Sequence, residues 1–263
     1  MFNIVECKNC KFKFTNPRPK KETIGKYYQS KDYISHTSSK KGLFNLVYQG
    51  VRKYQFRKKL SIINSLVNNE KKSLLDVGCG TGEFVSFCNK NHWNSKGVET
   101  DTKARSFAIN KNKCKVDESL DAAIKNEEQY DIITLWHVLE HVYDLDDYLK
   151  KLKSLLKKGG YLILGLPNHR SYDAKYFESS WFAYDLPIHV SHFSKTDIKK
   201  IVKKFNFTSL KTRPLIFDAY YISLLSSKKS NKTILHGFFI GLISNIKAIK
   251  TKEYSSQMYI IGS

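Results

Sequence analysis

The residues best suited to chemistry in this chain form a glycine-rich loop behind a short apolar segment. Residues 74–82 begin with two leucines and lead through Asp76 into three glycines at every second position, Gly78, Gly80 and Gly82. Glycine adopts positive φ without strain and lets a ligand lie directly on the main chain. A helix that starts near Gly82 would point free N–H groups at that ligand. The spacing G-x-G-x-G, with an acid two residues ahead, differs from the G-x-G-x-x-G of dinucleotide sites.

A second acidic position follows the next expected strand. Residues 96–101 form a short apolar run that ends in Glu99, Thr100 and Asp101. A carboxylate at the tip of a second strand accepts hydrogen bonds from both hydroxyls of a ribose. A nucleoside with a positively charged sulfonium tail suits both acids, so the two segments predict S-adenosylmethionine as the cofactor.

On these residues, the chain resembles the class I S-adenosylmethionine-dependent methyltransferases from about Cys7 to its end. The loop at 76–82 and Glu99 match the family's glycine loop and ribose-binding acid, residues 130–137 match its fourth strand, and residues 156–164 match its fifth. The resemblance implies an enzyme that transfers a methyl group. The residues that it assigns to the cofactor are Asp76, Gly78, Cys79, Gly80, Gly82, Glu99, Trp136 and His137.

The apolar periodicity switches repeatedly between strand and helix from Lys72 onward, as a doubly wound sheet requires. With the resemblance, this predicts an α/β, Rossmann-like, mostly parallel seven-stranded sheet whose last strand, 256–262, is antiparallel. We expect one helix over 143–158, ended by Gly159 and Gly160, and another over 194–205 with Ser194 as its N-cap.

The domain organisation predicted from the sequence is one large domain with a small appendage. Residues 43–263 form the methyltransferase domain and open with lead-in helices at 43–70. Residues 1–42 form an N-terminal appendage that resembles a zinc ribbon, and its part from Lys31 to about Gly42 reads as a linker. A length of 263 residues suits this arrangement.

Two groups of histidines are candidates for the reaction itself. The first, His137, Glu140 and His141, follows the fourth expected strand, and a helix there would place both histidines on one face at i and i+4. These residues could act as bases, bind a divalent cation or brace the loop. Ubiquinone-pathway O-methyltransferases and plant small-RNA 2′-O-methyltransferases have a comparable segment, but with a carboxylate in place of His137, and this difference weakens a magnesium interpretation.

The second group lies in residues 185–193, which resemble the segment that covers the acceptor in related methyltransferases. An imidazole suits deprotonation of an acceptor at neutral pH. We therefore assign His189, His192 and His141 as candidate catalytic residues, and expect His189 and His192 to contact the acceptor.

Cys7 and Cys10 form a Cys-x-x-Cys pair, which is half of a tetrahedral zinc site. Related methyltransferases often begin with two such pairs. Because only one is present here, we expect a truncated knuckle and assign no metal site. Five cysteines in a chain of this length do not form a disulfide framework, which fits a reducing cytoplasm as the location.

The net charge of +21 arises from 45 Lys and Arg against 24 Asp and Glu. Such a charge suits a nucleic acid or an anionic membrane, but the lysines are scattered and favour an ordinary solvated surface. The apolar residues 236–243 are too few to cross a bilayer. We expect them to form a core helix over the sheet; contact with a membrane surface is the alternative.

The predicted function is methyl transfer to a small-molecule acceptor. The resemblance extends to methyltransferases of polysaccharide biosynthesis, which implies a carbohydrate or nucleotide-sugar acceptor. An RNA methyltransferase and a non-catalytic binding protein of the same fold are the alternatives. The acceptor atom and the oligomeric state stay open.

Overall fold

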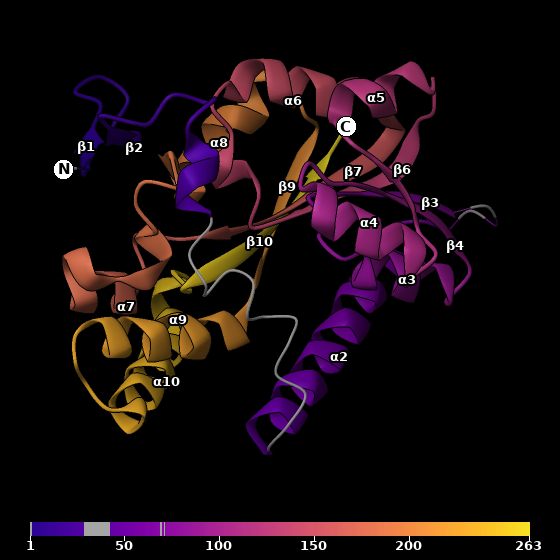
Figure 1. Ribbon diagram of the computed structural model, residues 1–263. Helices are drawn as coiled ribbons and strands as arrows, with labels where there is room; N and C mark the ends of the chain where they lie inside the picture. Colours follow the sequence, from indigo (N-terminus) through magenta and orange to yellow (C-terminus); the bar gives the residue numbers. More distant parts are fainter. Residues whose placement is uncertain (1, 29–42, 69, 71) are drawn as a thin grey trace. The chain divides into compact units, whose positions relative to one another are not determined.

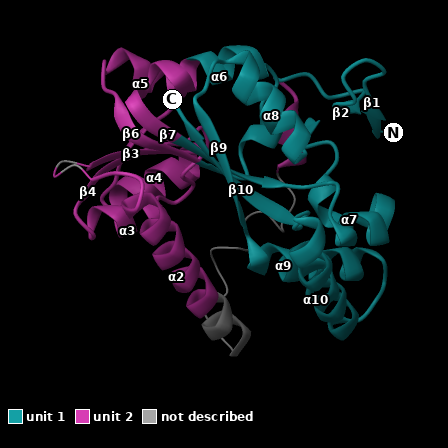
Figure 2. Ribbon diagram, turned by 180° about the vertical axis from the view of Figure 1, so that it is seen from behind, with its two compact units in different colours: residues 1–21, 135–150, 162–263 teal, residues 22–134, 151–161 magenta. Residues whose placement is uncertain are grey.

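The computed structural model describes residues 2–28, 43–68, 70 and 72–263 (Figure 1). The linker expected between Lys31 and Gly42, together with the domain boundary at residue 42, lies outside these residues. The chain divides into two compact units, which Figure 2 distinguishes by colour. Unit 1 comprises residues 1–21, 135–150 and 162–263, and unit 2 comprises residues 22–134 and 151–161.

Seven strands form one sheet in the order β5-β4-β3-β6-β7-β10-β9. Their bounds are β3 Lys72–Val77, β4 Trp93–Val98, β5 Lys115–Asp117, β6 Tyr130–Trp136, β7 Leu156–Pro167, β9 Ser209–Pro214 and β10 Ser256–Gly262. β3 pairs with β4, and β4 with β5, in parallel. β10 pairs with β9 antiparallel. The predicted seven-stranded, mostly parallel sheet with an antiparallel last strand is therefore confirmed.

Unit 2 is built around strands buried on both faces. Leu74 and Leu75 of β3, like Ile132 and Ile133 of β6, are completely buried, as expected where helices cover both sides of a parallel sheet. The other elements of this unit are η1 Ile24–Tyr27, α2 Leu43–Asn64, α3 Glu83–Asn89, α4 Thr102–Asn110 and α5 Leu120–Lys125. In this unit α3 and α4 lie on one side of the strands and α5 on the other (Figure 1).

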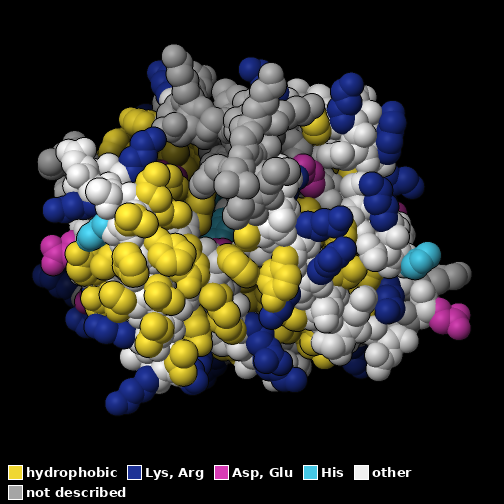
Figure 3. Space-filling view, turned by 90° about the horizontal axis from the view of Figure 1, so that it is seen from below, with side chains coloured by type: hydrophobic (Ala, Val, Ile, Leu, Met, Phe, Trp, Pro, Cys, Tyr) yellow, Lys and Arg dark blue, Asp and Glu magenta, His cyan; other side chains and the backbone are white. Residues whose placement is uncertain are grey.

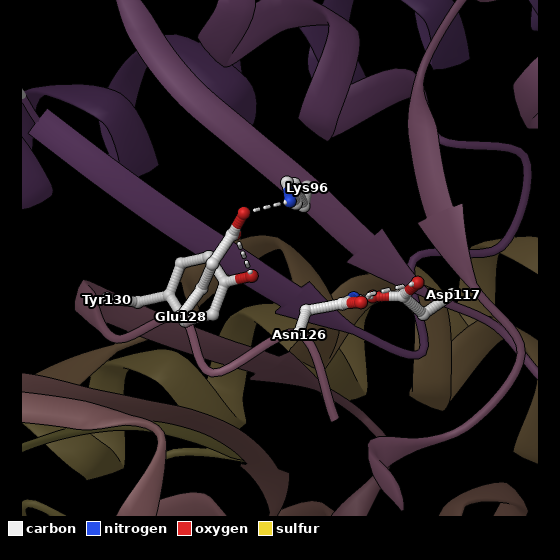
Figure 4. Close-up of polar contacts among 5 residues, drawn as sticks. All are labelled: Lys96, Asp117, Asn126, Glu128 and Tyr130. Carbon is white, nitrogen blue, oxygen red and sulfur yellow. Dashed lines mark hydrogen bonds and ion pairs between the residues drawn. The ribbon is translucent and has the colours of Figure 1, made fainter. Parts of the chain in front are cut away.

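Polar contacts fix the segment between α5 and β6 (Figure 4). Glu128 pairs with Lys96 of β4 at 2.6 Å and accepts a hydrogen bond from the Tyr130 hydroxyl at 3.0 Å. Lys96 lowers the pKa of the Glu128 carboxyl. The Asn126 amide donates to the Asp117 carboxylate. These contacts set where β6 begins, and β6 leads to the candidate site.

The helix expected over 143–158 is shorter than predicted. α6 spans Leu145–Ser154, and β7 already begins at Leu156, so Gly159 and Gly160 lie inside a strand. Lys157 forms an ion pair with Asp131 at 2.8 Å, and a Cβ on Gly160 would lie 3.1 Å or less from the carbonyls of Tyr130 and Asp131. Close approach to β6 therefore prevails over the helical periodicity of this segment.

Unit 1 contains a three-stranded antiparallel sheet that includes the N-terminal segment. β1 (Asn3–Glu6) pairs with β2 (Lys13–Asn16), and β2 pairs with β8 (Ser191–His192). Cys7 and Cys10 occupy the turn between β1 and β2, and both are free thiols. The N-terminal residues are thus joined by backbone hydrogen bonds to the lid segment, residues 185–193, which contains His189 and His192.

The remaining elements of unit 1 are mostly helical. They are η3 Leu139–His141, α7 Tyr172–Phe177, η4 Glu178–Ser180, η5 Phe182–Tyr184, α8 Lys195–Lys204, α9 Ile216–Lys229 and α10 Ile234–Thr251. Ser194 and Asp197 form a capping box that starts α8, which confirms the predicted N-cap. Buried Asp173 connects α7 to α10, because its carboxylate accepts hydrogen bonds from Trp181, Ser244 and Ser255.

The apolar residues 236–243 form core on one side only. Gly237, Ile240 and Gly241 of α10 are buried, whereas Phe238 is 47% and Phe239 56% exposed. The expectation of a core helix is therefore wrong for half of this stretch, because α7 and α9 cover one side of α10 and leave its outer face exposed. None of the helices formed by the described residues is long and apolar enough to cross a membrane.

Candidate active site

The glycine loop in unit 2 has the backbone conformation that its sequence predicts. Gly78, Gly80 and Gly82 have φ values of 73°, 55° and 74°, in the left-handed region. Gly82 is the N-cap of α3. A Cβ on Gly82 would lie 2.9 Å from the Cβ of Ala108, whereas a Cβ on Gly80 would meet nothing within 4 Å. Gly82 is thus required for packing, and Gly80 faces open space that a ligand can occupy.

Glu99, directly after β4, is joined to this loop by hydrogen bonds. Its Oε2 accepts from the Gly80 N–H at 2.8 Å, and its Oε1 accepts from the Asp101 N–H at 2.8 Å. Asp101 also caps α4, through a bond from the Ala104 N–H at 2.7 Å. Each oxygen of Glu99 keeps a further lone pair, so the half-buried carboxylate is fixed in place and can still accept from two ribose hydroxyls.

Asp76 lies beneath the glycine loop and is not exposed at its surface. Its side chain is buried at 3% exposure, and its Oδ1 accepts a hydrogen bond from the Thr134 hydroxyl at 2.6 Å. Burial raises the pKa of the Asp76 carboxyl to about 6, although the bond from Thr134 acts in the opposite direction. Any influence of Asp76 on a ligand would therefore act through the loop and through its charge.

The Cys79 side chain points into the protein. A Cβ on Gly97 would lie 2.4 Å from the Cys79 sulfur, so the thiol occupies the space that Gly97 leaves. Burial raises the pKa of this thiol above its ordinary value and keeps it protonated. Any contribution of Cys79 to ligand binding would come from its main chain.

His137, in unit 1, follows the end of β6 in a left-handed conformation with φ 56°. Its Nε2 lies 3.0 Å from the Asp218 carboxylate of α9, and its Nδ1 lies 3.6 Å from Glu140 Oε1. The His137 side chain is 41% exposed; its partial desolvation disfavours the charged imidazole, but Asp218 and Glu140 outweigh that effect and raise the pKa of His137 to about 10. With this pKa, His137 is a cation at neutral pH, not a base.

The ring of the neighbouring Trp136 lies against Gly165.

The helix that would place His137 and His141 on one face is not formed. Only η3, a single 3-10 turn at Leu139–His141, follows β6, and the positive φ of His137 keeps that residue out of any helical face. Glu140 is 1% exposed. Burial alone would raise the pKa of its carboxyl, but the imidazole of His137 prevails and lowers it to about 2. Among the described residues, no donor lies within hydrogen-bond distance of either Glu140 oxygen.

His141 and His189 lie beside this buried carboxylate. Their ring centroids are 4.6 Å apart in an edge-on arrangement. Burial lowers the pKa of His141 to about 4 and the pKa of His189 below its ordinary value. Nδ1 of His189 lies 2.9 Å from the Ala183 carbonyl and donates to it, which leaves Nε2 with a lone pair. One ligand atom each of Glu140, His141 and His189 lies within 4.8 Å of the other two, so these residues could also hold a cation.

His192 lies on β8 and contacts the N-terminal segment. Its Nε2 lies 3.1 Å from the Thr15 hydroxyl, which itself donates to the His189 carbonyl at 2.6 Å. The imidazole is 5% exposed, and burial lowers its pKa to about 3. A cavity of about 10 Å³, bordered by Glu140, His189 and His192, has room for roughly one water. His192 therefore joins β2 to the lid segment.

Three contributors to these regions could not be recognised from the sequence. Thr134 fixes Asp76, Asp218 charges His137, and Thr15 holds His192. They lie 58, 81 and 177 residues from their partners. Thr134 lies within a strand identified in the sequence, which was the one signal that could have pointed to it. No local pattern connects Asp218 or Thr15 to a histidine.

Comparison with known proteins agrees with this geometry. Residues 51–212 match a family model described as a methyltransferase domain. The chain is 27% identical over 156 residues to the ubiquinone biosynthesis O-methyltransferase of Pelagibacter ubique, which covers 55% of this chain and 65% of the relative. It is 31% identical over 124 residues to the protein of the same name from Hydrogenovibrio crunogenus, which covers 43% and 51%. The chain thus spans between about half and two thirds of the length of these relatives.

A solved structure supports the fold. The crystal structure of a SAM-dependent methyltransferase from Archaeoglobus fulgidus superimposes with a TM-score of 0.53 and 18% sequence identity. The match covers 84% of this chain and 100% of that one.

Proposed function

Because the chain belongs to the methyltransferase-domain family, we propose that it is an S-adenosylmethionine-dependent methyltransferase with a small-molecule acceptor. One observation carries the cofactor assignment. Glu99 is fixed by the Gly80 N–H at 2.8 Å, beside a glycine whose missing side chain leaves open space. A carboxylate held at a strand tip next to a bare main chain suits an adenosine that is bound through its ribose.

We call His137, Glu140, His141 and His189 the histidine cluster. It contains the kinds of groups that acceptor deprotonation requires. His189 is neutral, with a lone pair on Nε2, and Glu140 nearby is a buried carboxylate. A positive charge that develops on His189 or His141 during proton transfer would be stabilised by Glu140. We assign the role of general base to His189, with His141 beside it and Glu140 as a positioning residue. Bound S-adenosylmethionine would supply an electrophilic methyl group, and the protein would hold the acceptor and take up its proton.

The acceptor class is a finer proposal. The resemblance to polysaccharide-pathway methyltransferases favours a carbohydrate or nucleotide sugar, whereas the relatives from Pelagibacter ubique and Hydrogenovibrio crunogenus carry names from ubiquinone biosynthesis. Both classes present hydroxyl groups to a base. Transfer of labelled methyl to nucleotide sugars, to catechols and to RNA distinguishes them, and RNA as the sole acceptor would contradict the small-molecule assignment.

The cofactor assignment is tested by calorimetry with S-adenosylmethionine on a matched pair of glycine variants. Gly80 and Gly159 both have positive φ, and a Cβ on either meets nothing within 4 Å. Alanine at either position should therefore cost a similar backbone strain of about 1–2 kcal/mol. Gly80→Ala should weaken S-adenosylmethionine binding about tenfold or more, because its methyl group enters the ligand's space, while Gly159→Ala should leave the affinity unchanged.

Two results would overturn the cofactor assignment. One is the lack of binding heat with the wild-type chain. The other is an equal affinity for S-adenosylmethionine in both alanine variants. Glu99→Ala gives an independent measurement: loss of the ribose hydrogen bonds should weaken binding by about 1–3 kcal/mol, and an unchanged affinity would remove Glu99 from the site.

A further inference from the structure

The outer face of α10 is an exposed apolar surface that the reaction does not use. Six of its apolar side chains are between 47% and 78% exposed. They are Ile234, Leu235, Phe238, Phe239, Ile246 and Ile249. They recur at helical spacing along the 18 residues of α10, which is about 27 Å long. Figure 3 shows hydrophobic side chains gathered into one broad patch on this side of the molecule. We call these six residues the apolar face.

The opposite side of α10 packs on α9 and α7, and this packing holds the apolar face outward. A Cβ on Gly237 would lie 2.7 Å from the Leu224 Cα, and one on Gly241 would lie 2.9 Å from the Ala219 carbonyl oxygen. The helices therefore pack backbone against backbone at these two glycines. Ser244 of α10 also donates to the buried Asp173 carboxylate at 2.6 Å. Rotation of α10 to hide the apolar face would break both contacts.

Positive charge predominates on the hairpin, because Asp218 at the start of α9 is paired with His137. Residues 219–252, which include most of α9 and all of α10, contain six lysines and no aspartate or glutamate. Lys228 and Lys232 lie near the turn that precedes Ile234, and Lys250 lies at the other end of α10; all three are exposed. Cations therefore flank the apolar face at both ends.

From this combination, we infer that the α9–α10 hairpin docks on the surface of a membrane that contains anionic lipids. An apolar helix face flanked by lysines enters the boundary between headgroups and acyl chains and lies in the plane of that boundary. Each lysine near an anionic surface adds to the attraction. A protein partner would require acidic groups arranged around an apolar groove, whereas an anionic bilayer supplies both features over any area. The inference does not depend on the proposed function.

The test is co-sedimentation of the full chain with vesicles of phosphatidylcholine alone, and with vesicles that also contain about 30 mol% phosphatidylglycerol. We expect at least roughly tenfold stronger binding to the anionic vesicles, weakened by high salt. The double variant Phe238→Ser with Phe239→Ser should reduce that binding at least about tenfold. The triple variant of Lys228, Lys232 and Lys250 to Gln should reduce the preference for anionic vesicles.

A matched control is available on α4 of unit 2. Phe107 and Ile109 are 45% and 42% exposed, and the double variant Phe107→Ser with Ile109→Ser should bind vesicles like the wild type. Circular dichroism establishes that each variant is folded, and light scattering gives its oligomeric state. Failure of the wild type to bind anionic vesicles would overturn the inference, as would undiminished binding by Phe238→Ser with Phe239→Ser. A wild-type dimer that this double variant dissociates, without vesicle binding, would identify the face as a subunit interface instead.

Discussion

The glycine loop of unit 2 is formed mainly by main-chain atoms, whereas the histidine cluster of unit 1 is formed by side chains. In the loop, main-chain atoms border open space at Gly80, and the Glu99 carboxylate and the Asn112 amide are hydrogen-bonded to that main chain. In the cluster, side chains perform every role: His137 and Glu140 carry opposite charges, and His189 is held neutral by burial. A site made of backbone depends on local conformation, whereas a site made of side chains depends on what surrounds it.

This difference means that the two regions should fail in different ways. Changes in the loop should affect backbone strain and cofactor affinity. Changes in the cluster should affect turnover and the pH dependence of stability. The following variants test that division, beginning with the largest expected effect.

His189→Asn should lower turnover about 10²–10⁴-fold, the usual contribution of general acid–base catalysis, with S-adenosylmethionine affinity unchanged. Asparagine can still donate to the Ala183 carbonyl that His189 Nδ1 contacts at 2.9 Å, so the fold should persist. Steady-state kinetics and calorimetry provide the two readouts. The exposed His92, whose positive φ asparagine tolerates, supplies the control His92→Asn. Turnover of His189→Asn equal to that of the control would make His189 structural.

Gly82→Ala should destabilise the fold by about 2–5 kcal/mol. Alanine at φ 74° costs about 1–2 kcal/mol, and overpacking against the Ala108 Cβ at 2.9 Å costs about 1–3 kcal/mol more. Urea unfolding measures the change. Gly80→Ala, without that contact, should lose only the backbone part. Equal losses of stability would show that the space around the two glycines does not differ.

Asp76→Asn should raise stability at pH 7–8 by about 2 kcal/mol, since a buried carboxyl with a pKa near 6 is ionised there at a cost. The folded pKa lies above the unfolded one, so this carboxyl makes wild-type stability fall as pH rises from about 4 to 6. The asparagine variant should lack that fall, and it can still accept from Thr134. Thermal melts from pH 4 to 8 test this, and parallel curves for both proteins would contradict it.

Asp218→Asn should give the smallest change, about 1 kcal/mol at pH 7, because the His137 side chain is 41% exposed and solvent screens the pair. The folded pKa of His137, about 10, lies above the unfolded one. Its stabilisation is therefore complete below pH 6.5 and is lost as pH rises toward 10. The variant should show a flatter stability curve between these limits. A slope equal to that of the wild type would show that Asp218 does not set the charge of His137.

The sequence predicted the loop better than the cluster for a physical reason. Gly78, Gly80 and Gly82 owe their role to φ angles that glycine alone adopts readily, and Glu99 follows its strand by one residue. Such features depend on neighbours along the chain. The sequence left the conformation of 137–141 open. His137 has a left-handed backbone and contacts Asp218, which lies 81 residues away along the chain.

The chain by itself determined the seven-stranded sheet, its antiparallel last strand Ser256–Gly262 and the conformation of the glycine loop, since periodicity and glycine placement are local properties. Only the tertiary structure decided that His137 is a cation while His189 is neutral, because the charge of an imidazole follows from burial and from carboxylates brought close by folding. It also decided which face of α10 stays exposed, because a helix that is apolar on both faces does not specify which of them its partner covers.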